Sequence, residues 1–134
     1  MTPTFHTLLA QTAAALSLTT DPDGLTAQQA LLLAVHAGTA QPGEGSADWD
    51  LYAVAIAEAA ALVQAGLDTP ATLIDGLPGP GPDQPALREA IIALLRQLAD
   101  LYARAAGSGT GSPWRRLIWA QATHRLDDAA GELT

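Results

Sequence analysis

The sequence predicts an all-α protein, a single domain over residues 1–134 that folds as an up-and-down bundle of five to six helices. Long Ala/Leu-rich stretches alternate with short segments rich in Gly, Pro, Asp and Ser, a pattern typical of helices joined by turns. No stretch shows the period-two alternation with β-branched and aromatic residues that predicts a strand. A chain of 134 residues suffices for one core that buries roughly 65–70% of the unfolded surface.

Capping signals place most of the helix ends. Thr26 and Gln29 have the spacing of a capping box, with Gly38 expected just after the end of that helix near Ala37. Ser112 followed by proline predicts the start of the last helix. By the same reasoning Ser46 caps the third helix. The predicted helices cover residues 3–18, 26–37, 47–66, 70–76, 85–106 and 113–130.

The helix predicted at 47–66 is apolar on two nearly opposite faces. Such a helix is either central in the core or has one face against another subunit, and we expect it at the centre of the bundle. Glu58 lies within its second face. One prediction is that its side chain reaches solvent or pairs with an arginine of the last two helices. The other is that it is a partly buried carboxylate with a raised pKa, which serves a pocket or acts as a general base. The first face comprises Trp49, Tyr52, Ile56, Ala60, Val63 and Leu67, and the second Leu51, Val54, Ala55 and Leu62.

The last two long helices have one apolar face each. In 85–106, apolar residues recur at alternating spacings of four and three, with charged residues opposite them. The core-facing residues of 85–106 are predicted to be Leu87, Ile91, Leu94, Leu98, Leu101 and Ala105. Those of 113–130 and the residues just beyond are Trp114, Ile118, Ala122, Leu126, Ala129 and Leu133, with Trp119 at the border.

The charge distribution disfavours binding to nucleic acid or to an anionic membrane. The formal net charge is −8, there is no lysine, and residues 1–87 contain nine acids without any arginine. A membrane-spanning helix is not expected, since Asp50, Glu58 and Gln64 interrupt the most apolar stretch. Cysteine is absent and the N-terminus lacks a basic region followed by an apolar run, so we expect a cytoplasmic protein without disulfides.

The alanine- and arginine-rich, lysine-free composition resembles that of small all-helical proteins of unknown function encoded by high-GC actinobacterial genomes. This resemblance is compositional and extends loosely over the whole chain. It implies a helical fold and assigns no functional residue.

No motif for catalysis or for a cofactor is found, and no cofactor is expected. There is no Gly-x-Ser-x-Gly elbow and no Walker lysine. His124 and Asp128 lie one helical turn apart, and together with His36 they form the alternative set of metal ligands. The His-x-x-x-Asp pair resembles the DinB-like metal-binding four-helix bundles, which implies a metal site, although the second histidine of that pattern is missing from the last helix.

The segment PWRRLIW, residues 113–119, is the best candidate for a contact surface. Tryptophan and arginine dominate binding hot spots, so Arg115, Arg116 and Trp119 are candidate binding residues together with Glu58. The helices also carry more apolar surface than a small bundle needs, which favours a homodimer or another protein partner.

The leading hypothesis is therefore a non-enzymatic interaction, accessory or regulatory protein that acts through helix faces. The alternative is a small-molecule- or metal-binding bundle with a pocket between helices. Such a pocket would be lined by Glu58, Tyr52, Tyr102, His36 or Trp119.

Overall fold

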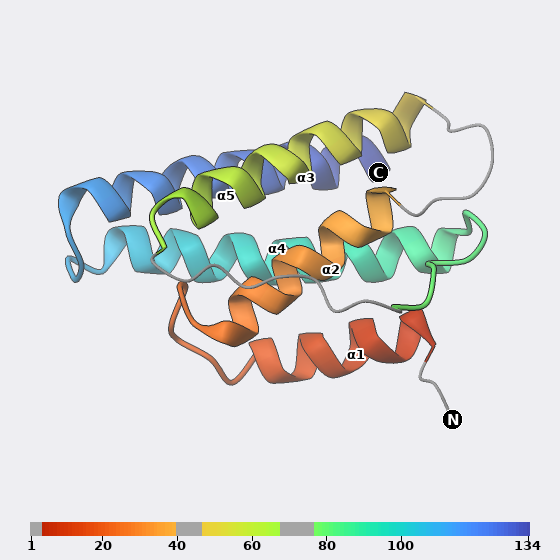
Figure 1. The fold of residues 1–134 in the computed structure, drawn as a ribbon, viewed down its shortest axis with the longest axis horizontal. Coiled ribbons are helices and arrows are strands. Elements are labelled where there is room, and N and C mark those ends of the chain that lie inside the picture. Colours follow the sequence, from red (N-terminus) through yellow and green to blue (C-terminus); the bar gives the residue numbers. More distant parts are fainter. Residues whose placement is uncertain (1–3, 40–46, 68–76) are drawn as a thin grey trace.

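The computed structural model describes residues 4–39, 47–67 and 77–134, and it confirms the all-α helical bundle (Figure 1). These ranges contain α-helices and no strand. The helices are α1 (Phe5–Leu16), α2 (Leu25–Thr39), α3 (Ala47–Ala65), α4 (Pro85–Gly107) and α5 (Pro113–Leu133).

The helix directions alternate wherever the described helices follow one another directly (Figure 1). α1, α2 and α3 alternate in direction, as do α4 and α5, but α3 and α4 run the same way along the molecule (Figure 1). The end of α3 and the start of α4 therefore lie at opposite ends of the bundle. The predicted up-and-down bundle counts a short helix at 70–76 between them, which lies outside the described residues. With that helix included, strict alternation also gives α3 and α4 the same direction.

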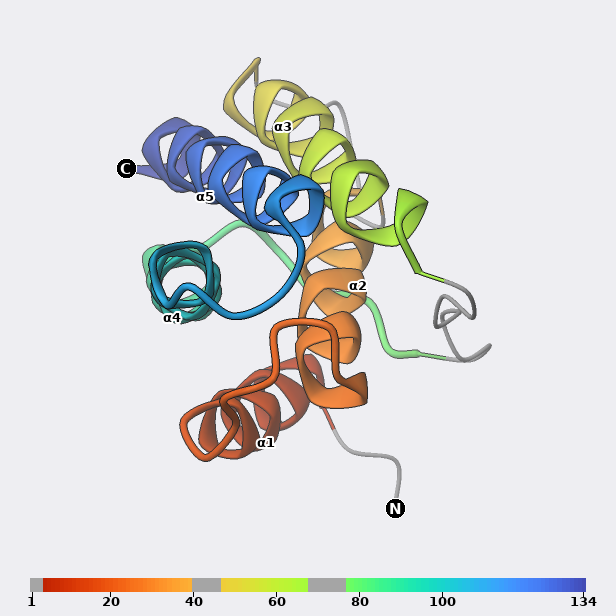
Figure 2. The same ribbon diagram turned by 90° about the vertical axis from the view of Figure 1, so that its left-hand side faces the viewer.

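The predicted central position of α3 is wrong. α3 packs against α2 and α5 but makes no close backbone approach to α1 or α4, whereas α2 and α4 each have three neighbours (Figure 2). The first face of α3 carries Trp49, Tyr52 and Ile56, which are buried. The second face carries smaller side chains and Glu58, and it remains at the surface, with Leu51 53% and Val54 58% exposed. Burying the larger side chains on one side satisfies the core, so the second apolar face of α3 is left without a partner helix.

The core follows the predicted faces of α4 and α5 closely. In the α4 face only Ala105 is half-buried, and the others are buried. In the α5 face every predicted residue except Trp114 is buried. Two aromatic side chains, Tyr52 and Tyr102, are fully buried. At roughly 1.5–3 kcal/mol for each buried large apolar side chain, these faces supply most of the driving force for folding.

The N-terminus of α2 differs from its prediction. The helix begins at Leu25, so Thr26 lies within the first turn and is not the N-cap. The chain enters α2 through a turn instead. In this turn the Asp21 carboxylate accepts a hydrogen bond from the Asp23 amide at 3.0 Å, and the Gln28 side chain donates one to the Asp23 carbonyl at 3.0 Å. Asp side chains that bond backbone two residues on stabilise such turns, and they compete with a capping box further along.

Other helix ends agree better with the sequence. Ser112 caps α5, its hydroxyl accepting from the Arg115 amide at 3.1 Å, and α3 ends just before Gly66. Gly38 lies inside α2, where a Cβ would stand 3.1 Å from the Tyr52 ring, so its role is to let α3 approach closely. The predicted cap Ser46 and the predicted short helix at 70–76 lie outside the described residues. None of the helices in the described ranges combines the length and hydropathy that a bilayer span requires.

Candidate functional site

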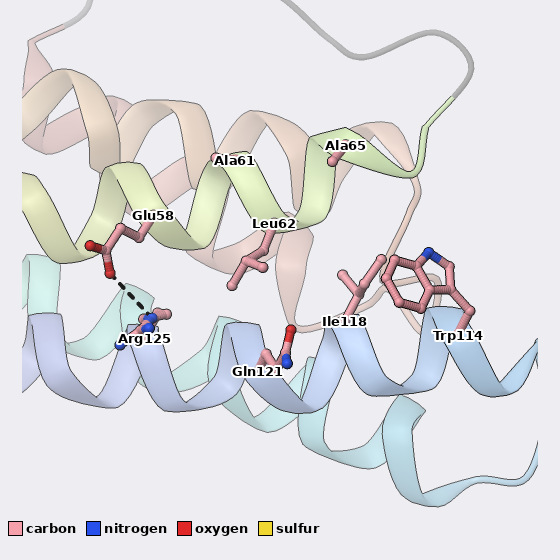
Figure 3. Close-up of a pocket in the computed structure, with 8 residues that line it drawn as sticks. All are labelled: Glu58, Ala61, Leu62, Ala65, Trp114, Ile118, Gln121 and Arg125. Carbon is pink, nitrogen blue, oxygen red and sulfur yellow. Dashed lines mark ion pairs between the residues drawn. The ribbon is translucent and has the colours of Figure 1, made fainter.

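The candidate site is a shallow apolar groove between α3 and α5, of about 400 Å³ (Figure 3). One wall is the outward face of α3 and the other is the outward face of α5. Most of the lining is aliphatic or aromatic, and two charged side chains lie towards one end. The α3–α5 groove is lined by Glu58, Ala61, Leu62, Ala65, Trp114, Ile118, Gln121 and Arg125.

The second face of α3 extends the groove along the helix. Leu51 and Val54 precede Glu58 by seven and four residues, so at 100° per residue they lie on the same side as the groove wall. Both are more than half exposed. We call Leu51, Val54 and the groove residues together the α3–α5 face. An unpaired apolar face of this kind on a small protein is typical of an interaction surface.

Glu58 and Arg125 form an ion pair across the groove, with Oε2 and Nε 3.2 Å apart. Each side chain is about half exposed, at 50% and 48%, so the pair contributes at most about 1 kcal/mol to stability. The predicted pairing of Glu58 with an arginine of the last two helices is confirmed. The competing prediction of a partly buried general base is wrong, since the carboxylate is at the surface and already paired.

Trp114 lies at the opposite end of the groove and is 69% exposed. The prediction that it belongs to the core is wrong, and Trp119 is buried instead, with 6% exposure. The groove holds the Trp114 indole beside Ile118 and Ala65 (Figure 3). The sequence periodicity could not separate the two tryptophans because it carries no information on where the neighbouring helix ends.

Arg115 and Trp119, predicted as surface contacts, are drawn inwards by Asp23. The Arg115 Nε donates to one Asp23 oxygen at 2.8 Å, and the Trp119 Nε1 donates to the other at 3.0 Å. Arg115 Nη2 also donates to the Val63 carbonyl at 2.8 Å, at the end of α3. We call Asp23, Arg115 and Trp119 the Asp23 clasp. It joins the α1–α2 turn, α3 and α5.

Two neighbours complete the surroundings of the clasp. Burial raises the pKa of the Tyr102 phenol well above its ordinary range, and the negative charge of Asp23 adds to that rise. Arg116 donates from Nε to the Ala106 carbonyl at 3.0 Å and so fastens α5 to the end of α4. Of the four predicted binding residues, only Glu58 therefore lies in the α3–α5 groove. Leu51, Val54, Trp114 and Arg125 were missed as site residues, although the second apolar face of the third helix already pointed to the first two.

The structure does not bring the alternative metal ligands together. His36 lies on α2, where its Nε2 is 3.0 Å from the Pro78 carbonyl and its ring faces Phe5. His124 and Asp128 are exposed on α5, which does not pack against α2. Over residues 4–39, 47–67 and 77–134 no group of three potential ligands has metal-binding geometry.

The residues predicted to line the alternative pocket do not come together either. The Tyr52 hydroxyl donates to the Ala34 carbonyl at 2.6 Å inside the core, whereas Glu58 faces solvent on the other side of α3. Comparison with known proteins adds no further assignment, since no family model, no curated protein and no solved structure matches the chain.

Proposed function

We propose that the protein is a non-enzymatic interaction or accessory protein of the cytoplasm, which binds a partner protein through the α3–α5 face. The observation that carries the proposal is the exposure of Leu51, Val54 and Trp114 along two adjacent helices. Large apolar side chains cost free energy in water, and a row of them beside a groove recovers that cost only when another surface covers it.

The shape of the groove favours a helix as the bound element. Amphipathic helices bind in apolar grooves between two helices through side chains spaced three and four residues apart. The alanines at 61 and 65 keep the wall of α3 low, so a helix can approach closely. Trp114, a residue type enriched at hot spots, supplies a large anchor at one end.

Site-specific photocrosslinking in the native host tests this proposal. A photoreactive phenylalanine analogue at position 54, within the α3–α5 face, is expected to give a discrete protein adduct after irradiation. The matched control is the same analogue at position 18, where Leu18 is 87% exposed just after α1, a helix that packs against neither α3 nor α5. Equal labelling at both positions, or none at position 54, would refute the proposed function.

A further inference from the structure

We infer that the partner bound at the α3–α5 face is a second copy of this chain, related by a two-fold axis that passes beside Glu58 and runs perpendicular to α3. This inference rests on the proposed function and names the occupant of the same surface. The two α3 helices would then lie antiparallel. The layer that α3 and α5 form in one copy would pack face to face on the same layer of the other copy.

The arrangement of side chains along α3 is self-complementary about Glu58. Two apolar residues, Leu51 and Val54, lie on one side of it, and Leu62 and Ala65 lie on the other. A two-fold axis at Glu58 places the first pair of each copy opposite the second pair of the other. An isologous contact requires a surface that is complementary to itself in this way, so that residue i of one copy contacts residue j of the other and the reverse.

The charges on the face select the antiparallel orientation. The acids of α3 and α5 gather at one end, because α3 starts where α5 finishes (Figure 1). The other end, around Ala65, Trp114 and Ile118, carries no charge in the groove lining. A two-fold axis puts each acidic end against the uncharged end of the other copy and keeps like charges apart. The acids at the first end are Asp50 and Glu132, together with Asp48 and Asp128, whose charges are paired with Arg88 and Arg125.

The ion pair at the centre of the face is also suited to a two-fold axis. Glu58 and Arg125 are half exposed, so each retains hydrogen-bonding capacity towards an approaching surface. A group at a two-fold axis faces its own copy, so Glu58 meets Glu58 and Arg125 meets Arg125, and each like-charge contact is offset by the intrachain partner 3.2 Å away. Charge pairs at an interface fix its register more than they strengthen it.

The size of the face indicates the strength to expect. From Leu51 to Ala65 the helix rises about 21 Å, and two helices side by side are about 20 Å wide, so the face covers about 400 Å². That is about half of the roughly 800 Å² per partner in a standard interface. A contact of this size belongs with weak, transient interfaces, so we expect a reversible dimer that forms in the micromolar range.

Sedimentation equilibrium of the purified full chain, from about 1 to 500 µM, tests the inference over that range. The wild type is expected to shift from monomer to dimer. Leu51→Glu should raise the dissociation constant at least tenfold. Leu18→Glu is the matched control, since Leu18 is 87% exposed just after α1, a helix that packs against neither α3 nor α5, and the charge change is the same. A wild type that stays monomeric up to the highest concentration overturns the inference, as does an equal effect of both variants.

A mixing experiment tests the two-fold register itself. Glu58→Arg and Arg125→Glu each place like charges at the centre, so each variant alone should dimerise at least tenfold more weakly than wild type. In an equimolar mixture every cross-contact pairs opposite charges, and the heterodimer should form with near wild-type affinity. Absence of this rescue overturns the proposed register, because a pair that acts only within one chain cannot be restored by mixing.

The two tests separate this inference from the proposed function. A crosslinked adduct at position 54 with twice the chain mass supports both. An adduct of any other mass, together with a monomeric wild type in sedimentation, keeps the proposed function and overturns the inference. Absence of any adduct at position 54 from a chain that dimerises in sedimentation contradicts the face and overturns both.

Discussion

Arg115 is the residue on which the interior polar contacts converge. Its guanidinium binds the Asp23 carboxylate and the Val63 carbonyl, and it lies 6.0 Å from the centre of the Trp119 ring. Its side chain is only 10% exposed, so its charge depends on these partners. Removing one partner of such a pair costs more than removing both, since the remaining charge is left in a poorly hydrated site.

A double-mutant cycle on the Asp23 clasp follows from this. We expect Asp23→Ala to lower the free energy of unfolding by about 2–4 kcal/mol, because it strands the Arg115 charge. Combining it with Arg115→Met should recover part of that loss, with a coupling free energy of about 1–3 kcal/mol. Urea unfolding of the four proteins at pH 7 measures both values. Strictly additive losses would show that the two side chains do not act as a pair.

Gly66 offers a second test at the same scale. A Cβ at this position would collide with Arg115 Nη1, which the clasp holds in place. Gly66→Ala should therefore destabilise the protein by about 1–3 kcal/mol through displacement of the guanidinium. Gly107→Ala is the matched control, because a Cβ at Gly107 meets nothing within 4 Å, and its effect should range from neutral to about 1 kcal/mol stabilising. Thermal and urea unfolding compare the two variants, and similar losses in both would contradict the role of Gly66.

The sequence identified the residue types of the clasp but not its contacts. Arg115 and Trp119 were interpreted as a surface because tryptophan and arginine are enriched at interfaces. Asp23 is 92 residues away from Arg115, in a turn whose other signals indicate only a chain reversal. A pairing at that separation leaves no local periodicity, so only the folded chain reveals it.

At the scale of elements, the start of α4 is tied to the start of α3 by a network on Arg88. Its guanidinium bonds both Asp83 oxygens at 2.8 Å and an Asp48 oxygen at 3.2 Å, and it lies 5.6 Å from the centre of the Trp49 ring. The hydrogen bonds from Arg88 lower the pKa of Asp83 to about 2. The network therefore joins two helices that make no close backbone approach to each other.

The lowered pKa predicts how this network responds to acid. Asp83 stabilises the fold above its ordinary pKa of 3.8, and the contribution is lost as the pH falls through about 2. Asp83→Asn should lower the free energy of unfolding by about 0.5–1 kcal/mol at pH 7, a small value because the carboxylate is partly exposed. The difference between wild type and variant should shrink below pH 3.8 and vanish near pH 2. Urea unfolding across this pH range tests it, and a difference that does not change with pH would contradict the assignment.

Elements with one apolar face were predicted better than the element with two. The alternating spacing of four and three in α4 identified five of its buried residues, because a single face leaves one way to bury it. In α3 both faces are apolar in sequence, and which one is buried depends on the helices available to cover it. The structure uses the face with the larger aromatic side chains.

At the scale of the whole molecule, the acidic charge and the apolar face act in opposite directions on self-association. Each copy carries a formal charge of −8, so two copies repel at long range. The charges on the face itself nearly cancel around Glu58 and Arg125.

The number of helices and the absence of strands from the described ranges could be predicted from the composition and from the turn segments rich in Gly, Pro, Asp and Ser. The shared direction of α3 and α4 agrees with an up-and-down bundle that counts the short helix predicted at 70–76, a segment outside the described residues.

The exposed indole of Trp114 gives the protein a built-in optical reporter. The chain has three tryptophans, and the other two, Trp49 and Trp119, are buried at 3% and 6% exposure. Since their indoles are shielded from water, we expect them to emit at shorter wavelength, and we expect Trp114 to supply the red edge of the spectrum and the fraction that acrylamide can quench. Because Trp114 lines the groove, covering the groove changes this fraction alone. Binding in the α3–α5 groove can thus be followed by the tryptophan fluorescence of unlabelled wild-type protein, with Trp114→Phe as the control that lacks this signal.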